Sequence, residues 1–232
     1  MPLLCLPNAG GGASQYFPWA RLLPPEIELC PIQPPGRENR LRETPLNQMD
    51  ALVEQLAEAL AGYLTGPFAI FGHSLGGLVG FELARTLRRR YGLHPAHLFI
   101  SARRAPHLPQ KFGPIHSLPD EMFVDELARR YNGIPDLIRQ DQEMLSLYMP
   151  ILRADVKIFE THSWVAEEPL DCPVSLFGGV DDTSVPVQDL AAWEIHSTKP
   201  VEMKLFPGGH FYHQTARQEL LTEINRSLAG MV

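Results

Sequence analysis

Short apolar runs alternate with longer helical patterns along the chain, and this alternation predicts the class of fold. Six runs, each bounded by Pro, Gly or Asn, indicate buried strands, and apolar residues at three- and four-residue spacing indicate amphipathic helices. Strands that alternate with helices build a mostly parallel sheet with helices on both faces, so we expect an α/β fold. The predicted strands are residues 3–6, 27–32, 68–71, 97–101, 174–177 and 201–206, and the predicted helices are residues 49–64, 75–91 and 211–228.

One long segment breaks this alternation, because residues 105–164 contain no convincing strand. The segment carries two helical patterns instead, one after Pro119 and one after Pro135. The second pattern is apolar on more than one face, which is typical of a helix sandwiched in a core or lining a cavity. We therefore expect a single domain, residues 1–232, with a helical lid inserted at about 105–164, and core burial of these helices is the alternative.

Composition, charge and cysteine content narrow the class of protein. Of the 232 residues, 44% are hydrophobic and 20% charged, and the net charge of −7 argues against binding to nucleic acid, which needs basic faces. The first residues lack the features of a signal peptide, and no apolar run reaches the roughly 20 residues of a membrane helix. Cys5, Cys30 and Cys172 lie far apart, without the spacing of a metal site. We expect a cytoplasmic protein with no membrane anchor and no bound metal.

A candidate nucleophile lies between the third predicted strand and the helix that follows it. The sequence Gly-His-Ser-Leu-Gly at 72–76 matches the G-x-S-x-G pattern in the strand–turn–helix context that the pattern requires. In such a turn the serine, here Ser74, stands at the carboxyl edge of the sheet and at the N-terminus of a helix, whose dipole favours a developing anion. The motif predicts a serine enzyme with the α/β-hydrolase fold. The neighbouring His73 is expected to pack, with no catalytic role.

A serine hydroxyl needs a base, and the base needs an acid that orients it. In this fold the acid and then the histidine follow the serine along the chain, each after a strand. His210 follows the last predicted strand behind two glycines, so we expect it to be the base. Asp181 and Asp182 both follow the strand before it, and side chains alternate in an extended segment, so one of the two faces the histidine. The spacing Gly-x-x-Asp-x-x-Val at 179–185, which hydrolases of this kind show, favours Asp182.

The oxyanion of an acyl-transfer intermediate requires two backbone N–H groups. One is expected from Leu75, the residue after the nucleophile, and the other from the loop at residues 7–12, with Ala9 as the best candidate. The glycines of this loop match neither a phosphate-binding loop nor a dinucleotide fingerprint, because the residues that complete those motifs are absent.

Several further segments together resemble the type II thioesterases, the discrete editing hydrolases of non-ribosomal peptide synthetases and polyketide synthases. The chain is also similar to the medium-chain thioesterase that acts on fatty acid synthase. Two features depart from the family pattern: Thr183 stands where proline is usual, and the chain begins almost directly at its first strand. The segments that carry the resemblance, which spans nearly the whole chain, are residues 4–13, 16–19, 33–37, 72–77, 150–155, 178–185 and 206–211.

The resemblance implies an activity, a partner and a catalytic triad. The activity is hydrolysis of acyl or aminoacyl thioesters from the phosphopantetheine arm of acyl or peptidyl carrier proteins, by a monomer that needs no metal or redox cofactor. The triad carried over from the family is Ser74, Asp182 and His210. A medium-chain fatty acyl thioesterase, a generic carboxylesterase or lipase, and a catalytically inactive hydrolase fold that serves as a binding partner are the alternatives.

Arginines form two groups that suggest a docking surface for an acidic carrier protein. The alternative for the first group is that cations at the C-terminus of a helix offset the helix dipole. The first group contains Arg85, Arg88, Arg89 and Arg90, and the second contains Arg103 and Arg104.

Overall fold

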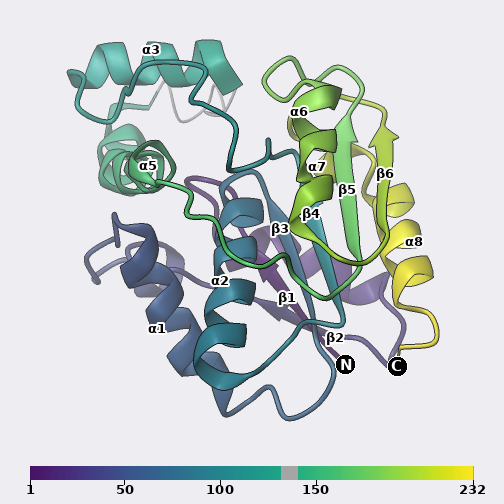
Figure 1. Cartoon of the computed structure of the whole chain (residues 1–232). Coiled ribbons are helices and arrows are strands. Elements are labelled where there is room, and N and C mark those ends of the chain that lie inside the picture. Colours follow the sequence, from purple (N-terminus) through teal and green to yellow (C-terminus); the bar gives the residue numbers. More distant parts are fainter. Residues whose placement is uncertain (132–140, 232) are drawn as a thin grey trace.

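The computed structural model describes residues 1–131 and 141–231, and this part of the chain contains a six-stranded sheet. All neighbouring strands pair in parallel, in the order β2-β1-β3-β4-β5-β6, so their carboxyl ends lie at one edge (Figure 1). All six predicted strands are present, and the predicted mostly parallel α/β fold is confirmed. The strands are β1 (Pro2–Leu6), β2 (Glu28–Pro31), β3 (Ala69–His73), β4 (His97–Ser101), β5 (Val174–Gly179) and β6 (Val201–Phe206).

Helices connect these strands, and the first two lie where the apolar spacing predicts them. Helix α1 spans Met49–Ala61 and helix α2 spans Leu75–Tyr91. Among the residues described, no helix has both the length and the apolar character needed to cross a bilayer. The other α-helices are α3 (Asp120–Tyr131), α5 (Gln142–Thr161), α6 (Val187–Ala191), α7 (Tyr212–Thr215) and α8 (Arg217–Leu228), and short 3₁₀ helices span Ala13–Arg21, Glu38–Arg40 and Ala192–His196.

Each face of the sheet has its own apolar core, because successive residues of a strand point to opposite faces. On one face, Leu4 and Leu6 of β1 pack with residues of α1, α2 and α5. On the other face, Leu3 and Cys5 pack with residues of α7 and α8. Figure 1 shows the same layers, with α1 and α2 on one side of the sheet and α8 on the other. Burial on both faces explains why the strands are continuously apolar and do not alternate with polar residues.

The predicted helix at 211–228 is wrong in one respect, because the chain there forms two helices, α7 and α8. Ala216, between them, has φ −100° and ψ 33°, which lies outside the α-helical region. The break lets α7 place Tyr212 against β4, where its hydroxyl oxygen lies 2.5 Å from Ser101 Oγ, while α8 packs along the sheet. Apolar spacing does not reveal this break, since both helices bury residues in the same core.

Between β4 and β5 the chain forms α3 and α5, and the part of this segment that the structure describes contains no named strand, as the sequence pattern predicts. Both helices lie above the edge at which the strands end (Figure 1). The first half of α5 exposes Met144 and Leu147, whereas its second half buries Leu152 and Val156 in the same core as α1 and α2. The second half therefore belongs to the domain core. The predicted helix start after Pro135 falls outside the described residues.

Candidate active site

Ser74 occupies the sharp turn between β3 and α2. Its backbone has φ 54° and ψ −113°, a conformation that residues other than glycine rarely adopt. The two flanking glycines permit this turn through close backbone contacts. A Cβ on Gly72 would lie 2.0 Å from the Gly76 carbonyl oxygen, and a Cβ on Gly76 would lie 2.2 Å from the Leu6 carbonyl oxygen. Larger residues at these two positions would therefore displace the backbone on which Ser74 stands.

The structure brings the three residues of the expected triad into one hydrogen-bonded chain. His210, which follows β6, has its Nε2 3.0 Å from Ser74 Oγ. Its Nδ1 lies 2.8 Å from Oδ2 of Asp182, which follows β5. A carboxylate only accepts hydrogen bonds, so Nδ1 carries the proton in a neutral ring and Nε2 is left to accept from the serine hydroxyl. This arrangement is able to draw a proton from Ser74.

Asp182, and not Asp181, faces the histidine. Asp182 is buried and Asp181 is exposed, with a backbone N–H that donates to the Gly208 carbonyl oxygen at 3.0 Å. The hydroxyl of Ser184 donates to Oδ1 of Asp182 at 2.6 Å, and the backbone N–H of Ser184 donates to the same atom at 2.9 Å. Burial alone would raise the pKa of Asp182, but the hydrogen bonds from His210 and Ser184 outweigh burial, and the pKa of Asp182 is lowered. The carboxylate is thus held in its charged form beside His210.

His73 is buried beside His210, which is consistent with the packing role expected for it. Its Nδ1 lies 2.8 Å from Ser101 Oγ, and its ring centroid lies 3.8 Å from that of His213 and 5.3 Å from that of His210. Burial and the neighbouring His213 and His210 lower the pKa of His73 well below its usual value, so this ring is neutral. His210 therefore rests on an uncharged aromatic support.

The two expected oxyanion donors lie beside Ser74 on different elements. Leu75 is the first residue of α2, so its N–H has no acceptor within the helix. Ala9 lines the same pocket as Ser74, and its carbonyl oxygen accepts a hydrogen bond of 2.9 Å from the Asn8 side chain. Both residues are thus near the nucleophile.

Two pockets meet at Ser74 and differ in character. The walls of both pockets, of about 430 Å³ and about 570 Å³, are of mixed polar and apolar surface, but more charged side chains line the second. Ser74, His210, Arg103, Tyr131 and Phe159 line both pockets. The residues that line only the first include Leu127, Leu152 and Phe211, and those that line only the second include Arg104, Gln110, Lys111, Arg130 and Glu160.

A strained serine, a paired histidine and two pockets that meet at the serine fit the family that the sequence resembles. The thioesterase domain family matches residues 1–228. The chain belongs to this family. Two relatives confirm the predicted resemblance to the type II thioesterases. A third relative accounts for the similarity to the medium-chain thioesterase of fatty acid synthase.

Similarity extends over nearly the whole of each relative. The gramicidin S biosynthesis protein GrsT of Aneurinibacillus migulanus is 43% identical over 219 residues, which cover 94% of this chain and 85% of that protein. The solved structure of the type II thioesterase BorB, from the borrelidin biosynthetic cluster, is 36% identical with a TM-score of 0.88, and the match covers 98% of this chain and 92% of BorB. The medium-chain S-acyl fatty acid synthase thioesterase of Rattus norvegicus is more distant, at 28% identity over 217 residues, or 90% of this chain and 80% of that enzyme.

Arg103 is a site residue that the thioesterase resemblance did not single out. Its Cζ lies 5.3 Å from the centre of the Phe159 ring, its buried Nε has no hydrogen-bond partner, and it forms no ion pair with any described residue. Burial lowers the pKa of Arg103 to about 10, which still leaves the side chain charged at neutral pH. Arg103 and Ser184 each follow the end of a strand, at the edge where catalytic residues gather, and this position is the signal that would have found them.

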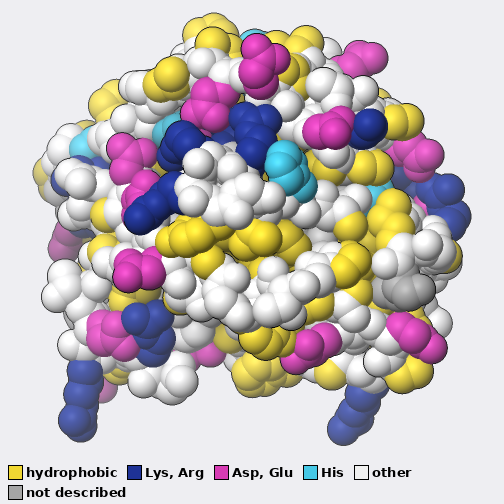
Figure 2. Space-filling model, turned by 60° about the horizontal axis from the view of Figure 1, so that its bottom comes forward, with side chains coloured by type: hydrophobic (Ala, Val, Ile, Leu, Met, Phe, Trp, Pro, Cys, Tyr) yellow, Lys and Arg dark blue, Asp and Glu magenta, His cyan; other side chains and the backbone are white. Residues whose placement is uncertain are grey.

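The structure does not bring the two groups of arginines together. Three members of the first group, Arg88, Arg89 and Arg90, lie in the last turn of α2, about 20 Å or more along the helix from Leu75. There Arg88 and Arg89 form ion pairs with Glu167 at 3.3 and 3.1 Å. Arg104 lies at the opposite edge and pairs with Asp189 at 3.2 Å. On the face that Figure 2 brings forward, basic and acidic side chains are likewise interspersed. The two groups therefore do not form one cluster.

The described residues contain no group of three or more His, Cys, Asp or Glu side chains that could hold a metal ion. All three cysteines are free, with Cys5 and Cys172 buried and Cys30 partly exposed. The polar groups around Ser74 are instead those of acid–base and nucleophilic chemistry.

Proposed function

We propose that this enzyme is a serine thioesterase that removes acyl or aminoacyl groups from the phosphopantetheine arm of carrier proteins, in an editing role. The observation that carries the proposal is the hydrogen-bonded chain of Ser74, His210 and Asp182 at the junction of the two pockets. The likeness to GrsT and to BorB, proteins of peptide and polyketide antibiotic pathways by their names, supports the editing role. A fatty acyl thioesterase is the less favoured reading, because that relative is more distant.

The proposed reaction has two steps, both served by the same histidine. In the first, His210 takes the proton of Ser74 as the hydroxyl oxygen attacks the thioester carbonyl, and backbone N–H groups of Leu75 and Ala9 bind the oxyanion. His210 then gives its proton to the departing thiol. In the second step a water molecule, deprotonated by His210, attacks the acyl–serine ester; the bond to Ser74 breaks, His210 returns the proton to the serine oxygen, and the free acid leaves. Serine and histidine supply the nucleophile and the base, so we propose that the reaction requires no cofactor.

The two pockets suggest how the substrate lies. We propose that the acyl group occupies the smaller pocket, beside Leu152 and Phe211, and that the arm enters through the larger pocket, which more charged side chains line. Arg103 lines both pockets as a half-buried cation without a described counter-ion. Its free donors suit the amide carbonyl oxygens of the pantetheine arm. Lys111 and Arg130 line the outer part of the same pocket and suit the approach of an acidic carrier protein.

The segment at about 105–164 is proposed to act as a lid on a single domain. Leu127 and Tyr131 of α3 and Phe159 of α5 line the pocket that contains Ser74, which supports this role. Carrier proteins are the proposed partners, and the chain is proposed to work as a monomer. Three free thiols support the proposed cytoplasmic location, since disulfides are rare in reducing compartments.

A comparison of substrates tests the proposal against a carboxylesterase, which would use the same triad. We expect kcat/KM for an octanoyl-phosphopantetheinyl carrier protein to exceed that for ethyl octanoate by at least about 100-fold, because only the carrier substrate fills both pockets. A higher value for the simple ester would overturn the thioesterase assignment. The Ser74→Ala variant is the control for both substrates. Unchanged turnover by this variant would mean that Ser74 does not catalyse the reaction, and would favour the alternative that the fold is catalytically inactive.

A further inference from the structure

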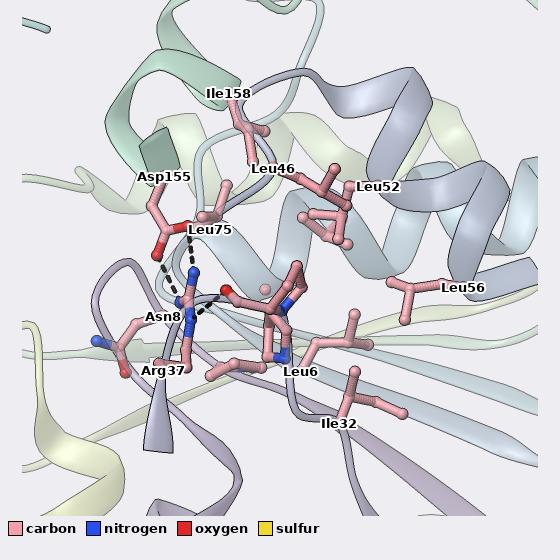
Figure 3. Close-up of a pocket in the computed structure, with 15 residues that line it drawn as sticks. Leu6, Asn8, Ile32, Arg37, Leu46, Leu52, Leu56, Leu75, Asp155 and Ile158 are labelled. Atoms are coloured by element: carbon pink, nitrogen blue, oxygen red, sulfur yellow. Dashed lines mark hydrogen bonds and ion pairs between the residues drawn. The ribbon is translucent and has the colours of Figure 1, made fainter. Parts of the chain in front are cut away.

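Two segments that carry the family resemblance have no part in the triad, and the structure brings them together. Residues 33–37 form a loop after β2, and residues 150–155 lie in the middle of α5. Arg37 ends the first segment and Asp155 ends the second, 118 positions apart in the sequence. Both side chains are buried, and they meet beside Asn8, against the loop at residues 7–12 (Figure 3). That loop contains Ala9, the proposed oxyanion donor.

Arg37 and Asp155 form a two-bond ion pair that also holds the backbone of the loop. Nη1 of Arg37 donates to Oδ2 of Asp155 at 2.7 Å, and Nη2 donates to Oδ1 at 2.9 Å. Oδ2 of Asp155 also accepts the backbone N–H of Gly10 at 2.8 Å, and Nη1 of Arg37 donates to the Gly11 carbonyl oxygen at 3.0 Å. The pair therefore binds one N–H and one C=O of the loop, both within two residues of Ala9.

Helix α5 contacts the same loop a second time, one turn before Asp155. Gly10 has φ +75°, and a Cβ on it would lie 2.7 Å from Cδ2 of Leu152. The second half of α5 thus fixes the loop through an apolar contact and a charged hydrogen bond. Because this half is part of the domain core, it provides a rigid support.

An ion pair buried to this degree is a weak source of stability, since removing two charges from water costs about as much as their attraction gains. Two apolar side chains of the same size would fill the site without that cost. They would leave the Gly10 N–H without its acceptor, however, and the Gly11 carbonyl oxygen without the Arg37 donor. The charged pair is therefore suited to holding the loop in one conformation.

We propose that Asp155 and Arg37 are positioning residues, which set the Ala9 N–H in the geometry that binds the oxyanion. The inference rests on the proposed function, because it needs the tetrahedral intermediate of acyl transfer. An oxyanion donor acts in the transition state and not on the bound substrate, so its displacement lowers kcat and leaves KM nearly unchanged. The same displacement weakens a trifluoromethyl ketone inhibitor, whose adduct with a catalytic serine carries an oxyanion.

The experiment compares the single variant Asp155→Asn with the double variant Arg37→Met/Asp155→Leu. The single variant leaves Arg37 buried without a full counter-charge and is expected to lower the melting temperature. The double variant removes both charges and is expected to recover much of that loss. Both are expected to lower kcat for octanoyl-pantetheine by about 100-fold with KM unchanged, and to weaken an octyl trifluoromethyl ketone by a similar factor.

A matched pair elsewhere in the core provides the control. Arg85 and Glu82 of α2 form a buried ion pair at 3.0 Å, and neither lines the pockets at Ser74. The variant Arg85→Met/Glu82→Leu is expected to keep wild-type kcat and inhibitor affinity. A stable Arg37→Met/Asp155→Leu enzyme with wild-type kcat and wild-type inhibitor affinity would overturn the positioning role while leaving the thioesterase assignment intact. Absence of thioester hydrolysis by the wild-type enzyme would instead overturn the proposed function.

Discussion

The turn that carries Ser74 and the loop that carries Ala9 lie side by side at the edge of the sheet, but they are held in different ways. The turn is shaped by close backbone packing, since a Cβ on Gly72 would meet the Gly76 carbonyl oxygen and a Cβ on Gly76 would meet the Leu6 carbonyl oxygen. The loop is held from outside by Arg37 and Asp155, which come from two distant parts of the chain. The proposed nucleophile thus depends mainly on close packing of backbone atoms, whereas the loop of the proposed oxyanion donor depends on buried charged side chains.

This difference separates two kinds of damage to the site. A change in the turn or in its histidine–aspartate support removes the chemistry itself. A change in the support of the loop leaves the nucleophile in place and weakens only the stabilisation of the transition state. The two regions meet at Gly76, which packs against the Leu6 and Pro7 carbonyl oxygens at the start of the loop.

The acid behind His210 gives the largest expected effect among the tests of this comparison. We expect Asp182→Asn to lower kcat by roughly 10,000-fold, because an amide donates to Nδ1 and favours the wrong tautomer of His210. The neighbouring exposed residue is the matched control, and Asp181→Asn is expected to stay within about twofold of wild type. The measurement is kcat for a soluble octanoyl thioester. Equal losses in the two variants would contradict the choice of Asp182.

The three residues of the proposed triad could be predicted from the sequence, through two kinds of signal. Ser74 and His210 follow from strand ends and from glycine patterns, which are local signals. Asp182 follows from a spacing that the family shares. The pairing of Arg37 with Asp155 could not be predicted, because it depends on how a loop after β2 and a helix far along the chain pack together. The break at Ala216 could not be predicted either, because the helices on both sides of it bury apolar residues in one core, so the apolar spacing continues across it.

The contact between turn and loop is tested by a substitution at Gly76. The Cβ of Gly76→Ala would lie 2.2 Å from the Leu6 carbonyl oxygen, so the backbone must shift, and we expect a loss of about 3 kcal/mol in the free energy of unfolding. Gly62→Ala is the control, because no atom lies within 4 Å of the added Cβ, and it is expected to change stability by less than about 0.5 kcal/mol. Urea unfolding measures both. Similar stability of the two variants would contradict the close packing at Gly76.

The acid sensitivity of the fold gives the smallest effect and tests a region away from both turn and loop. Burial lowers the pKa of His97 to about 4, and burial together with His107 lowers that of His196 to about 4. Between about pH 6.5 and pH 4 the unfolded chain binds protons at these positions and the folded chain does not, so stability falls as pH falls, by up to about 1.4 kcal/mol per pH unit for each group.

His97→Gln isolates one of these groups, because it keeps a polar atom for the Ser175 hydroxyl, which lies 2.9 Å from His97 Nε2, and it does not titrate. Urea unfolding at pH 7, 6 and 5 is expected to show a shallower loss for this variant than for wild type. Parallel loss in the two proteins would show that His97 does not contribute to acid sensitivity.

The most direct test of the thioesterase assignment is intact-protein mass spectrometry of an octanoyl-loaded carrier protein incubated with the enzyme. The account predicts that wild-type enzyme converts the carrier to its free-thiol form, and that Ser74→Ala does so about a millionfold more slowly. The account is contradicted if the wild-type enzyme leaves the octanoyl group in place, or if Ser74→Ala releases it at the wild-type rate.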